Sequence, residues 1–171
     1  MRAYSAYGAD SSCSPRVGYV KLNRGYVWRS SWCGVYPNRR GVNILRIDPF
    51  SCSLQYWNSF DTHQYSSAAT SLANHLLQLN HGQILVGVSA DAPSRYLSNA
   101  LSTLRQFFRV YVSDVQQRGS FAFVAQKGFP RKTVYSKVVY ESTSPAYVST
   151  TVTGITAVSY THLTLPTIYS V

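Results

Sequence analysis

The chain has 171 residues, of which 45% are hydrophobic and 14% aromatic, so its composition excludes a disordered chain and indicates one domain with a core. Sixteen Lys and Arg residues oppose six Asp and Glu residues. The formal net charge of +10 favours anionic partners, unless it serves solubility alone. No apolar run reaches about 18 residues, so no membrane span is expected.

The first predicted elements are a β-hairpin and a buried strand. Two alternating runs within residues 17–28 meet at residues 23–25, where Asn and Gly tolerate the positive φ of a tight turn. The next strand, residues 42–47, is apolar on both faces and is therefore expected to be buried. A further strand in residues 52–57 leads to the tripeptide FDT at residues 60–62.

Two arginines and a glycine precede the strand at residues 42–47. Alternation along this strand divides its side chains between two faces: Val42, Ile44 and Arg46 on one, and Asn43, Leu45 and Ile47 on the other. Gly41 is best explained as a backbone requirement at the entrance of the strand. Arg39 is expected to be a surface charge.

Two amphipathic helices are predicted on either side of a central strand. The first, in residues 67–80, has one apolar stripe made of Ala68, Leu72, Leu76 and Leu79. The central strand is the apolar run at residues 83–89. The second helix follows Pro93 with Ser94 as its N-cap, and its stripe is made of Leu97, Leu101, Leu104 and Phe108.

Four further strands are expected, in residues 108–114, 120–128, 134–141 and 146–154. Strands with two interspersed helices predict an α+β fold, a single compact domain of mainly antiparallel β-sheets covered by two or more short helices.

The chain ends are expected to lie outside this domain. Residues 158–171 carry no charged side chain and resemble translated sequencing-adapter DNA, although a Thr-rich edge strand is the alternative. The expected organisation has three parts: an N-terminal extension at residues 1–16, a domain at residues 17–156, and an artefactual tail at residues 157–171. The extension is expected to be truncated, with a signal peptide missing from it.

Three cysteines, Cys13, Cys33 and Cys52, allow one disulfide and a free thiol. Such a count is compatible with an extracellular setting. The absence of a CxxC pair or a Cys/His cluster argues against a zinc site, so no metal is expected.

The sequence offers little catalytic chemistry. It contains no HExxH, GxSxG, P-loop or GxGxxG motif. Asp61 and Asp91 are the only pair of carboxylates at strand ends that a glycosidase could use, and turn formation explains both of them better. Roles in turns and helices explain the histidines more simply than catalysis does; these histidines are His63, His75 and His81. We therefore expect a protein that is not an enzyme and needs no cofactor.

Nucleic acid is not expected to be the partner. Aromatic residues follow Arg-Gly at two places, but the RNA-recognition pattern is out of register at residues 118–121, and no second strand of that kind is present.

Four pieces of sequence, taken in order, resemble one known family: "RRGVNILRIDP", "FDT", "GQILVGVSADAPSRYL" and "QQRGSFAFVAQKG". They are similar to the interleukin-like EMT inducer (ILEI)/PANDER domain, and the similarity covers residues 17–128. Gly119, Phe121 and Cys52 stand where the family usually has Asp, Trp and Gly. The resemblance implies a secreted or lumenal, non-catalytic module, similar to the stem domain of O-mannose N-acetylglucosaminyltransferase, which binds carbohydrate.

The resemblance also implies a carbohydrate site. The family's sugar-contacting residues fall on Arg40, Asp91 and Arg118, whose donors and acceptors suit vicinal hydroxyls. Phe121 is the candidate for a ring that covers the sugar, with Tyr96 and Trp57 as further choices. The structural alternative is that Arg40 and Arg118 pair with Asp61 or Asp114. Cys13 with Cys33 resembles the family's pairing, and Cys33 with Cys52 is the alternative.

The expected function is therefore recognition of a glycan or glycoprotein by an Arg/Asp/Arg pocket. The alternatives are a cytokine-like ligand of a cell-surface receptor and an accessory domain of a glycan-processing enzyme. Surface cations, including Arg24, Arg29, Arg39, Lys127, Arg131 and Lys132, also favour sulfated glycans by charge.

Overall fold

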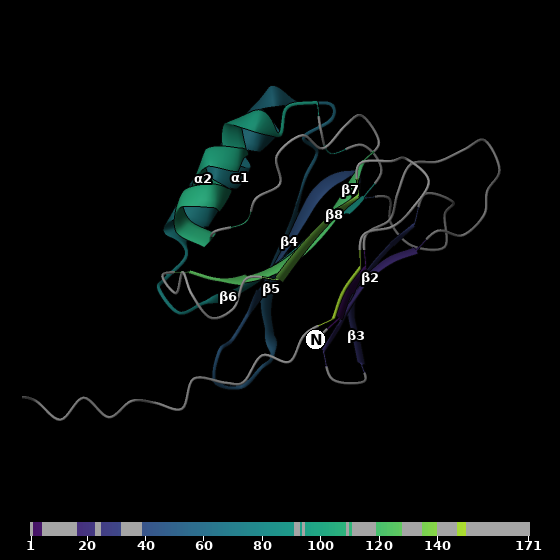
Figure 1. Cartoon of the computed structure of the whole chain (residues 1–171), viewed down its shortest axis with the longest axis vertical. Coiled ribbons are helices and arrows are strands. Elements are labelled where there is room, and N and C mark those ends of the chain that lie inside the picture. Colours follow the sequence, from purple (N-terminus) through teal and green to yellow (C-terminus); the bar gives the residue numbers. More distant parts are fainter. Residues whose placement is uncertain are drawn as a thin grey trace, which may run out of the picture.

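The computed structural model describes two sheets and two helices (Figure 1). The described residues are 2–4, 17–22, 25–31, 39–90, 93, 95–108, 110, 119–127, 135–139 and 147–149. In the larger sheet the strand order is β5-β4-β6-β7-β8, with the bounds β4 Gly41–Ile47, β5 Leu54–Phe60, β6 Ile84–Ala90, β7 Ser120–Gln126 and β8 Tyr135–Val139.

The smaller sheet has the order β3-β2-β1-β9, with the bounds β1 Arg2–Tyr4, β2 Val17–Leu22, β3 Gly25–Ser31 and β9 Tyr147–Ser149. Neighbouring strands pair antiparallel in both sheets. The hairpin of β2 and β3 and the antiparallel α+β fold are thus confirmed. Strand β1 was not predicted, because residues 1–16 were placed in an extension.

The larger sheet is the middle layer of the molecule. Helices α1 Ser66–Gln78 and α2 Ser98–Phe108 lie on one of its faces, and the smaller sheet lies on the other (Figure 1). Each face of the larger sheet has its own hydrophobic cluster, one under the helices and one between the sheets. A sheet covered on both faces needs strands that are apolar on both faces, and β4, β6 and β7 meet that requirement.

Strand β4 shows the predicted division of side chains. Val42 and Ile44 belong to the cluster under the helices, and Leu45 and Ile47 belong to the cluster between the sheets. Asn43 is also fully buried on the second face. Because successive side chains alternate, this one strand contributes to both cores.

The helices present the predicted stripes to the sheet. In α1, Leu72, Leu76 and the following Leu79 are buried, and Ala68 packs against the same cluster. The helix α2 begins at Ser98, later than expected, and its predicted cap Ser94 lies outside the described residues.

The predicted strand at residues 108–114 is not seen where the chain is described. Phe108 is the last residue of α2 and Val110 is not in a strand, while its other residues lie outside the described part. The tail at residues 157–171 also lies outside it, so the proposed domain boundaries stay predictions. Neither described helix is long and apolar enough to cross a bilayer.

Lys127 ties the end of β7 to helix α1. Its Nζ donates hydrogen bonds to the carbonyl oxygens of Leu76, Leu77 and Leu79 at 3.2, 2.6 and 2.7 Å. Leu76 and Leu77 lie in the last turn of α1, where carbonyl oxygens lack partners within a helix, and Leu79 caps it, so the ammonium satisfies the C-terminal end of α1. Burial lowers the pKa of Lys127. Lys127 is only 5% exposed, so its prediction as a surface cation is wrong, and the attraction of sulfated glycans by the other cations stays a prediction.

Cys52 lies in the turn between β4 and β5 and has a φ of 55°. This conformation favours glycine, which agrees with the residue that the family usually has there. Cys52 is a free thiol in the structure, so the Cys33–Cys52 alternative is not formed. Cys13 and Cys33 lie outside the described residues, and their pairing stays a prediction.

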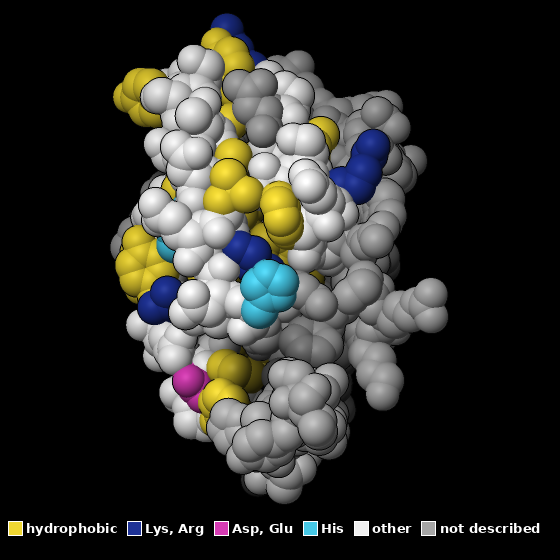
Figure 2. Space-filling model, turned by 90° about the vertical axis from the view of Figure 1, so that its left-hand side faces the viewer, with side chains coloured by type: hydrophobic (Ala, Val, Ile, Leu, Met, Phe, Trp, Pro, Cys, Tyr) yellow, Lys and Arg dark blue, Asp and Glu magenta, His cyan; other side chains and the backbone are white. Residues whose placement is uncertain are grey.

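Exposed aromatic and aliphatic side chains lie beside basic ones on the surface. On the face shown in Figure 2, Lys and Arg side chains stand next to hydrophobic ones, and acidic side chains are scarce among the described residues. The large hydrophobic residues exposed over the described part of the chain are Tyr26, Phe50, Tyr56, Trp57, Tyr65 and Leu77. Two of them, Tyr56 and Trp57, belong to the edge strand β5.

Candidate functional site

The site is built where β4 begins and β5 ends. Gly41 has a φ of 96°, and a Cβ added to it would lie 2.1 Å from the carbonyl oxygen of Phe60 and 2.8 Å from the amide nitrogen of Thr62. Only glycine fits this backbone, which confirms the role predicted for Gly41. The close approach brings Arg40 beside Asp61.

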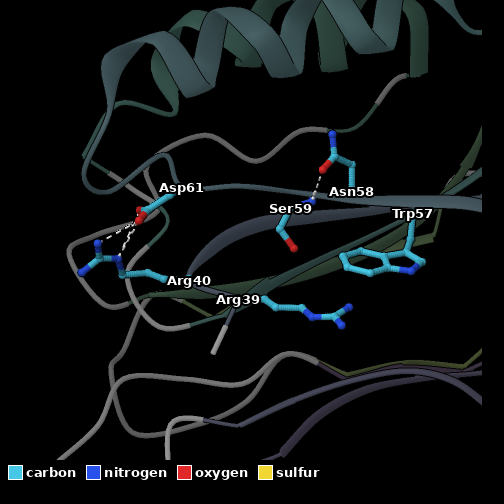
Figure 3. Close-up of a pocket in the computed structure, with 6 residues that line it drawn as sticks. All are labelled: Arg39, Arg40, Trp57, Asn58, Ser59 and Asp61. Atoms are coloured by element: carbon cyan, nitrogen blue, oxygen red, sulfur yellow. Dashed lines mark hydrogen bonds and ion pairs between the residues drawn. The ribbon is translucent and has the colours of Figure 1, made fainter. Parts of the chain in front are cut away.

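Arg40 and Asp61 form a bidentate ion pair (Figure 3). The Nε of Arg40 donates to both carboxylate oxygens of Asp61 at 3.1 Å, and its Nη2 donates to Oδ2 at 2.8 Å. The same Nη2 also donates to Oε1 of Gln64. The side chains of the pair are 26% and 27% exposed, so the pair lies at the surface of the fold. The structural alternative considered for Arg40, pairing with Asp61, is confirmed.

The pair changes the titration of Asp61. Burial alone would raise the pKa of its carboxyl group, but the hydrogen bond from Arg40, the amide of Gln64 and the positive charge of Arg40 together hold that pKa below its usual value. Asp61 is therefore ionised at neutral pH and forms an ion pair with Arg40.

Thr62 joins the same corner to the segment before α2. Its Oγ1 donates to the carbonyl oxygen of Pro93 at 2.7 Å, and its own carbonyl oxygen accepts from the amide of Tyr96 at 2.9 Å. Phe60 is buried in the cluster under the helices. The tripeptide FDT thus holds three parts of the fold together.

An open pocket of about 520 Å³ lies beside the ion pair. Its lining residues are Arg39, Arg40, Trp57, Asn58, Ser59 and Asp61. Figure 3 shows Arg40 and Asp61 at one end, Arg39 and Trp57 at the other, and Ser59 between them. The guanidinium carbon of Arg39 is 3.7 Å from the ring centre of Trp57, whose side chain is 39% exposed. The pocket therefore combines an aromatic ring with charged and neutral polar groups.

The buried side chain of Asn43 links two residues that line the pocket, Arg39 and Ser59. Its Nδ2 donates to the carbonyl oxygen of Arg39 at 2.9 Å, and its Oδ1 accepts from the hydroxyl of Ser59. A buried amide must find such partners. Asn43 consequently fixes the backbone of Arg39 against β5.

Two of the four predicted site residues, Asp91 and Arg118, lie outside the described residues. The described positions next to Asp91 do reach the same corner, since Gly41 pairs with Ala90 across β4 and β6. The amide of Phe121 donates to Oγ of Ser89 at 2.9 Å, so the beginning of β7 lies next to the end of β6. Arg40 is thus the one predicted polar residue that the structure places in the pocket.

Phe121 does not lie in the pocket. Its side chain is fully buried under the helices, and its ring centre is 6.1 Å from that of Phe123. A ligand cannot reach a ring enclosed in the core, so Phe121 offers no surface for a sugar in this structure. Of the aromatic residues considered, Trp57 is the one that lines the pocket.

The sequence predicts Arg39 as a surface charge and gives no role to Asn58 or Ser59, yet all three line the pocket. Strand alternation was the available signal: Arg39 has the same parity as Asn43 and Leu45, and Leu45 pairs with Trp57 across β4 and β5. Burial lowers the pKa of Arg39. Over the part of the chain that the structure describes, no cluster of His, Cys, Asp and Glu could hold a metal ion.

The chain folds as a compact α+β domain, because it has two antiparallel sheets and helices that cover the outer face of the larger one. The family model described as interleukin-like EMT inducer matches residues 40–129, just over half of the chain. The chain therefore belongs to the interleukin-like EMT inducer (ILEI/PANDER) family, whose members are cytokine-like or stem-like domains and are generally non-catalytic. The comparison with curated proteins gives no match.

Proposed function

We propose that this domain is a secreted or lumenal, non-catalytic module that binds carbohydrate, free or on a glycoprotein, at the corner around Arg40. One observation carries the proposal: the motif residue Arg40 lines an open pocket of about 520 Å³ together with the exposed indole of Trp57. Pockets of this size suit small ligands.

The lining suits a sugar chemically. A pyranose offers hydroxyl groups that both donate and accept hydrogen bonds, and it offers an apolar ring face. Arg40 supplies donors, Asn58 and Ser59 supply amide and hydroxyl groups, and Trp57 supplies an aromatic ring. Trp57, one of the three aromatic residues considered, would cover the apolar face of the sugar in place of Phe121.

Asp91 and Arg118 complete the proposed site. An ionised Asp accepts hydrogen bonds from two neighbouring hydroxyls, and Arg presents a planar set of donors. Support comes from the pairing of Gly41 with Ala90, since Asp91 is the next residue in the chain after Ala90.

A matched pair of Asp variants tests the proposal. Asp91→Asn and Asp48→Asn remove the same charge. Asp48 lies in the turn at the far end of β4, where its Oδ1 accepts from the amides of Phe50 and Ser51 at 2.8 and 2.7 Å. Asn also serves in such turns.

On a glycan array the wild-type chain and Asp48→Asn should bind the same oligosaccharides. Asp91→Asn should bind them roughly tenfold or more weakly, since hydrogen bonds to charged groups are worth about 1.5–3 kcal/mol. A wild-type chain that binds no glycan contradicts the proposal.

A cytokine-like action on a cell-surface receptor is the second candidate. The observation in its favour is the edge strand β5, which exposes Tyr56 and Trp57. Exposed aromatic residues are frequent in protein interfaces. Receptor capture on cells that persists in Asp91→Asn, together with an empty glycan array, would favour this candidate.

A further inference from the structure

A cluster of Arg46, Tyr56 and His75 lies at the β5 edge of the larger sheet and does not line the pocket around Arg40. Arg46 of β4 pairs in register with Tyr56 of β5, so the two side chains share one face of the sheet. Helix α1 covers that face, since Ile44, two residues before Arg46, lies in the cluster under the helices. His75 of α1 reaches the same place, with its ring centre 5.4 Å from that of Tyr56.

Two nitrogen atoms of this cluster are buried without a hydrogen-bond partner. They are the Nε of Arg46 and the Nε2 of His75. Arg46 also forms no ion pair with any residue that the structure describes, and its charged group faces the ring of Tyr56, 5.7 Å from its centre. Buried polar atoms in folded proteins nearly always have a partner, so two orphans beside one ring indicate a group that comes from outside the chain.

The chemistry of these two nitrogen atoms suits a carboxylate. The Nε–H and one Nη–H of an arginine form a fork that matches the two oxygens of a carboxylate. Burial and then the charge of Arg46 lower the pKa of His75, so its imidazole is neutral at neutral pH and offers one N–H. A planar group with one negative charge therefore balances the site, whereas phosphate brings more charge and more oxygens than these donors match.

The cluster is open to solvent on the side of β5. Tyr56 is 40% exposed, while Arg46 and His75 are half-buried behind it. Strand β5 is an edge of the sheet, and the backbone groups of an edge strand can pair with an extended segment of another chain. A carboxylate therefore has two sources, a small acid or an acidic side chain of a segment that pairs with β5.

We propose that Arg46 and His75 form a binding site for a carboxylate group at the β5 edge of the sheet. Arg46 holds the two oxygens in its fork, the Nε2–H of His75 is a further donor, and Tyr56 is the aromatic wall. The proposal goes beyond glycan recognition at the Arg40 corner, and a chain that binds no glycan leaves it standing.

Two-dimensional NMR of the ¹⁵N-labelled full chain at neutral pH observes the Nε–H of Arg46 directly, because burial protects it from exchange with water. Sodium acetate should shift this signal and the amides of residues 55–57 until they saturate. Sodium chloride at equal ionic strength should leave them in place, and sodium phosphate should bind more weakly than acetate.

A blocked peptide, Thr-Val-Glu-Val-Thr, and its counterpart with Gln in place of Glu separate the two sources of the carboxylate. Tighter binding of the Glu peptide than of acetate, lost with the Gln peptide, assigns the carboxylate to a protein segment. Binding of acetate that equals or exceeds that of the Glu peptide assigns it to a small acid.

Arg46→Gln should weaken acetate binding at least roughly tenfold, followed through the amides of residues 55–57. Arg46→Lys keeps the charge but has no fork, and it should lose affinity similarly. His75→Phe keeps a ring without an N–H and should bind several-fold more weakly. Arg95→Gln is the matched control and should bind as the wild-type chain does, since Arg95 is exposed with its guanidinium carbon 5.2 Å from the ring centre of Tyr96.

Shifts that do not saturate, or that are equal for acetate and chloride, would overturn the proposal, and so would tighter binding of phosphate than of acetate. Equal losses in Arg46→Gln and Arg95→Gln would overturn it as well, because general attraction by the basic surface would then explain the binding. Undiminished affinity in Arg46→Lys would contradict the fork. Circular dichroism should confirm that the variants are folded, and the titration of the wild-type chain remains decisive if one of them is not.

Discussion

Asp61 holds Arg40 in a bidentate ion pair, with the Nη2 of Arg40 2.8 Å from Oδ2 of Asp61. The pair joins the residue before β4 to the residue after β5, and it also forms one end of the pocket. A residue that the family resemblance assigns to ligand binding therefore also stabilises the fold. Loss of Arg40 alone is a poor test of binding, because it leaves Asp61 without its partner.

The ion pair predicts that the stability of the fold depends on pH in the acid range. The folded-state pKa of Asp61 lies below its unfolded value of 3.8, so the pair stabilises the fold above that pH. This contribution is lost as the pH falls through the lower, folded-state pKa. Asp61→Asn should therefore show a shallower loss of stability in acid, measured as urea midpoints from about pH 5 to about pH 2.

The expected difference at neutral pH is about 1 kcal/mol or less, because solvent screens a pair that is only partly buried. Arg40→Gln in the wild-type background should flatten the acid slope in the same direction. An acid slope in Asp61→Asn identical to that of the wild-type chain would contradict the pairing.

Gly41→Ala should destabilise the fold strongly. The new Cβ would lie 2.1 Å from the carbonyl oxygen of Phe60, and a φ of 96° is strained for alanine. We expect a loss of roughly 3 kcal/mol in the free energy of unfolding, measured by urea denaturation.

Gly25→Ala is the control for this change, since the nearest atom to its Cβ would be the carbonyl oxygen of Leu22 at 3.9 Å. It should change the free energy of unfolding by less than about 1 kcal/mol. Equal effects of the two substitutions would show that the close approach at Gly41 does not matter.

Lys127→Met should loosen the C-terminal end of α1. Methionine keeps the length and most of the apolar contacts of the side chain but donates no hydrogen bond to Leu77 or Leu79. The buried carbonyls left without a partner should lower the free energy of unfolding by about 1–3 kcal/mol.

Hydrogen exchange should show the loss in the last turn of α1 first. Lys21→Met is the comparison, because the Nζ of Lys21 lies 4.0 Å from the ring centre of Tyr26 and is expected to contribute about 1 kcal/mol at most. A smaller effect at Lys127 than at Lys21 would argue against the capping role.

His75 predicts a second pH dependence. Burial, and then the charge of Arg46, lower the pKa of His75 below its ordinary value of 6.5. Its ring packs against Tyr56 and Phe60 at centre distances of 5.4 and 5.7 Å. Below pH 6.5 the unfolded chain therefore binds a proton that the folded chain resists.

Stability should consequently fall as the pH drops from 6.5 to the folded-state pKa of His75. His75→Gln should reduce this fall, and His81→Gln, which alters an exposed residue, should not. Thermal denaturation of the three proteins across this pH range measures the effect. A wild-type melting temperature that is constant there would contradict it.

Local patterns in the sequence predict much of the fold. Alternation along β4 placed Val42 and Leu45 on opposite faces, and helical periodicity identified the buried stripe of α1. These predictions succeed because burial selects apolar residues at fixed intervals. The turn preferences of glycine likewise identified the entrance of β4 at Gly41.

Contacts between distant residues were not predictable in the same way. The three carbonyls that Lys127 binds lie about 50 positions earlier in the chain. The ring of Phe123 packs over Gly87, where a Cβ would lie 2.2 Å away, and this contact depends on the register of β6 with β7. Nothing local in the sequence specifies such a register.

In the candidate site, some residues were predictable from the sequence and others were not. Motif position points to Arg40, which lines the pocket, but also to Phe121, although alternation along β7 places Phe121 on the same buried face as Phe123 and Ala125. The contact of Arg39 with Trp57 cannot be predicted from the sequence, because it needs β5 as the edge strand beside β4. A residue that a motif match assigns to a site should therefore also occupy an exposed position in the periodicity of its strand or helix.

Mapping of the bound ligand by two-dimensional amide NMR tests the central claim most directly. The oligosaccharide that binds best on the glycan array should be titrated into the ¹⁵N-labelled chain. Glycan recognition at the Arg40 corner predicts the largest shift changes in the amides of residues 39–41 and 57–61. Changes confined to the β2–β3 hairpin, or spread evenly over the basic surface, would contradict it.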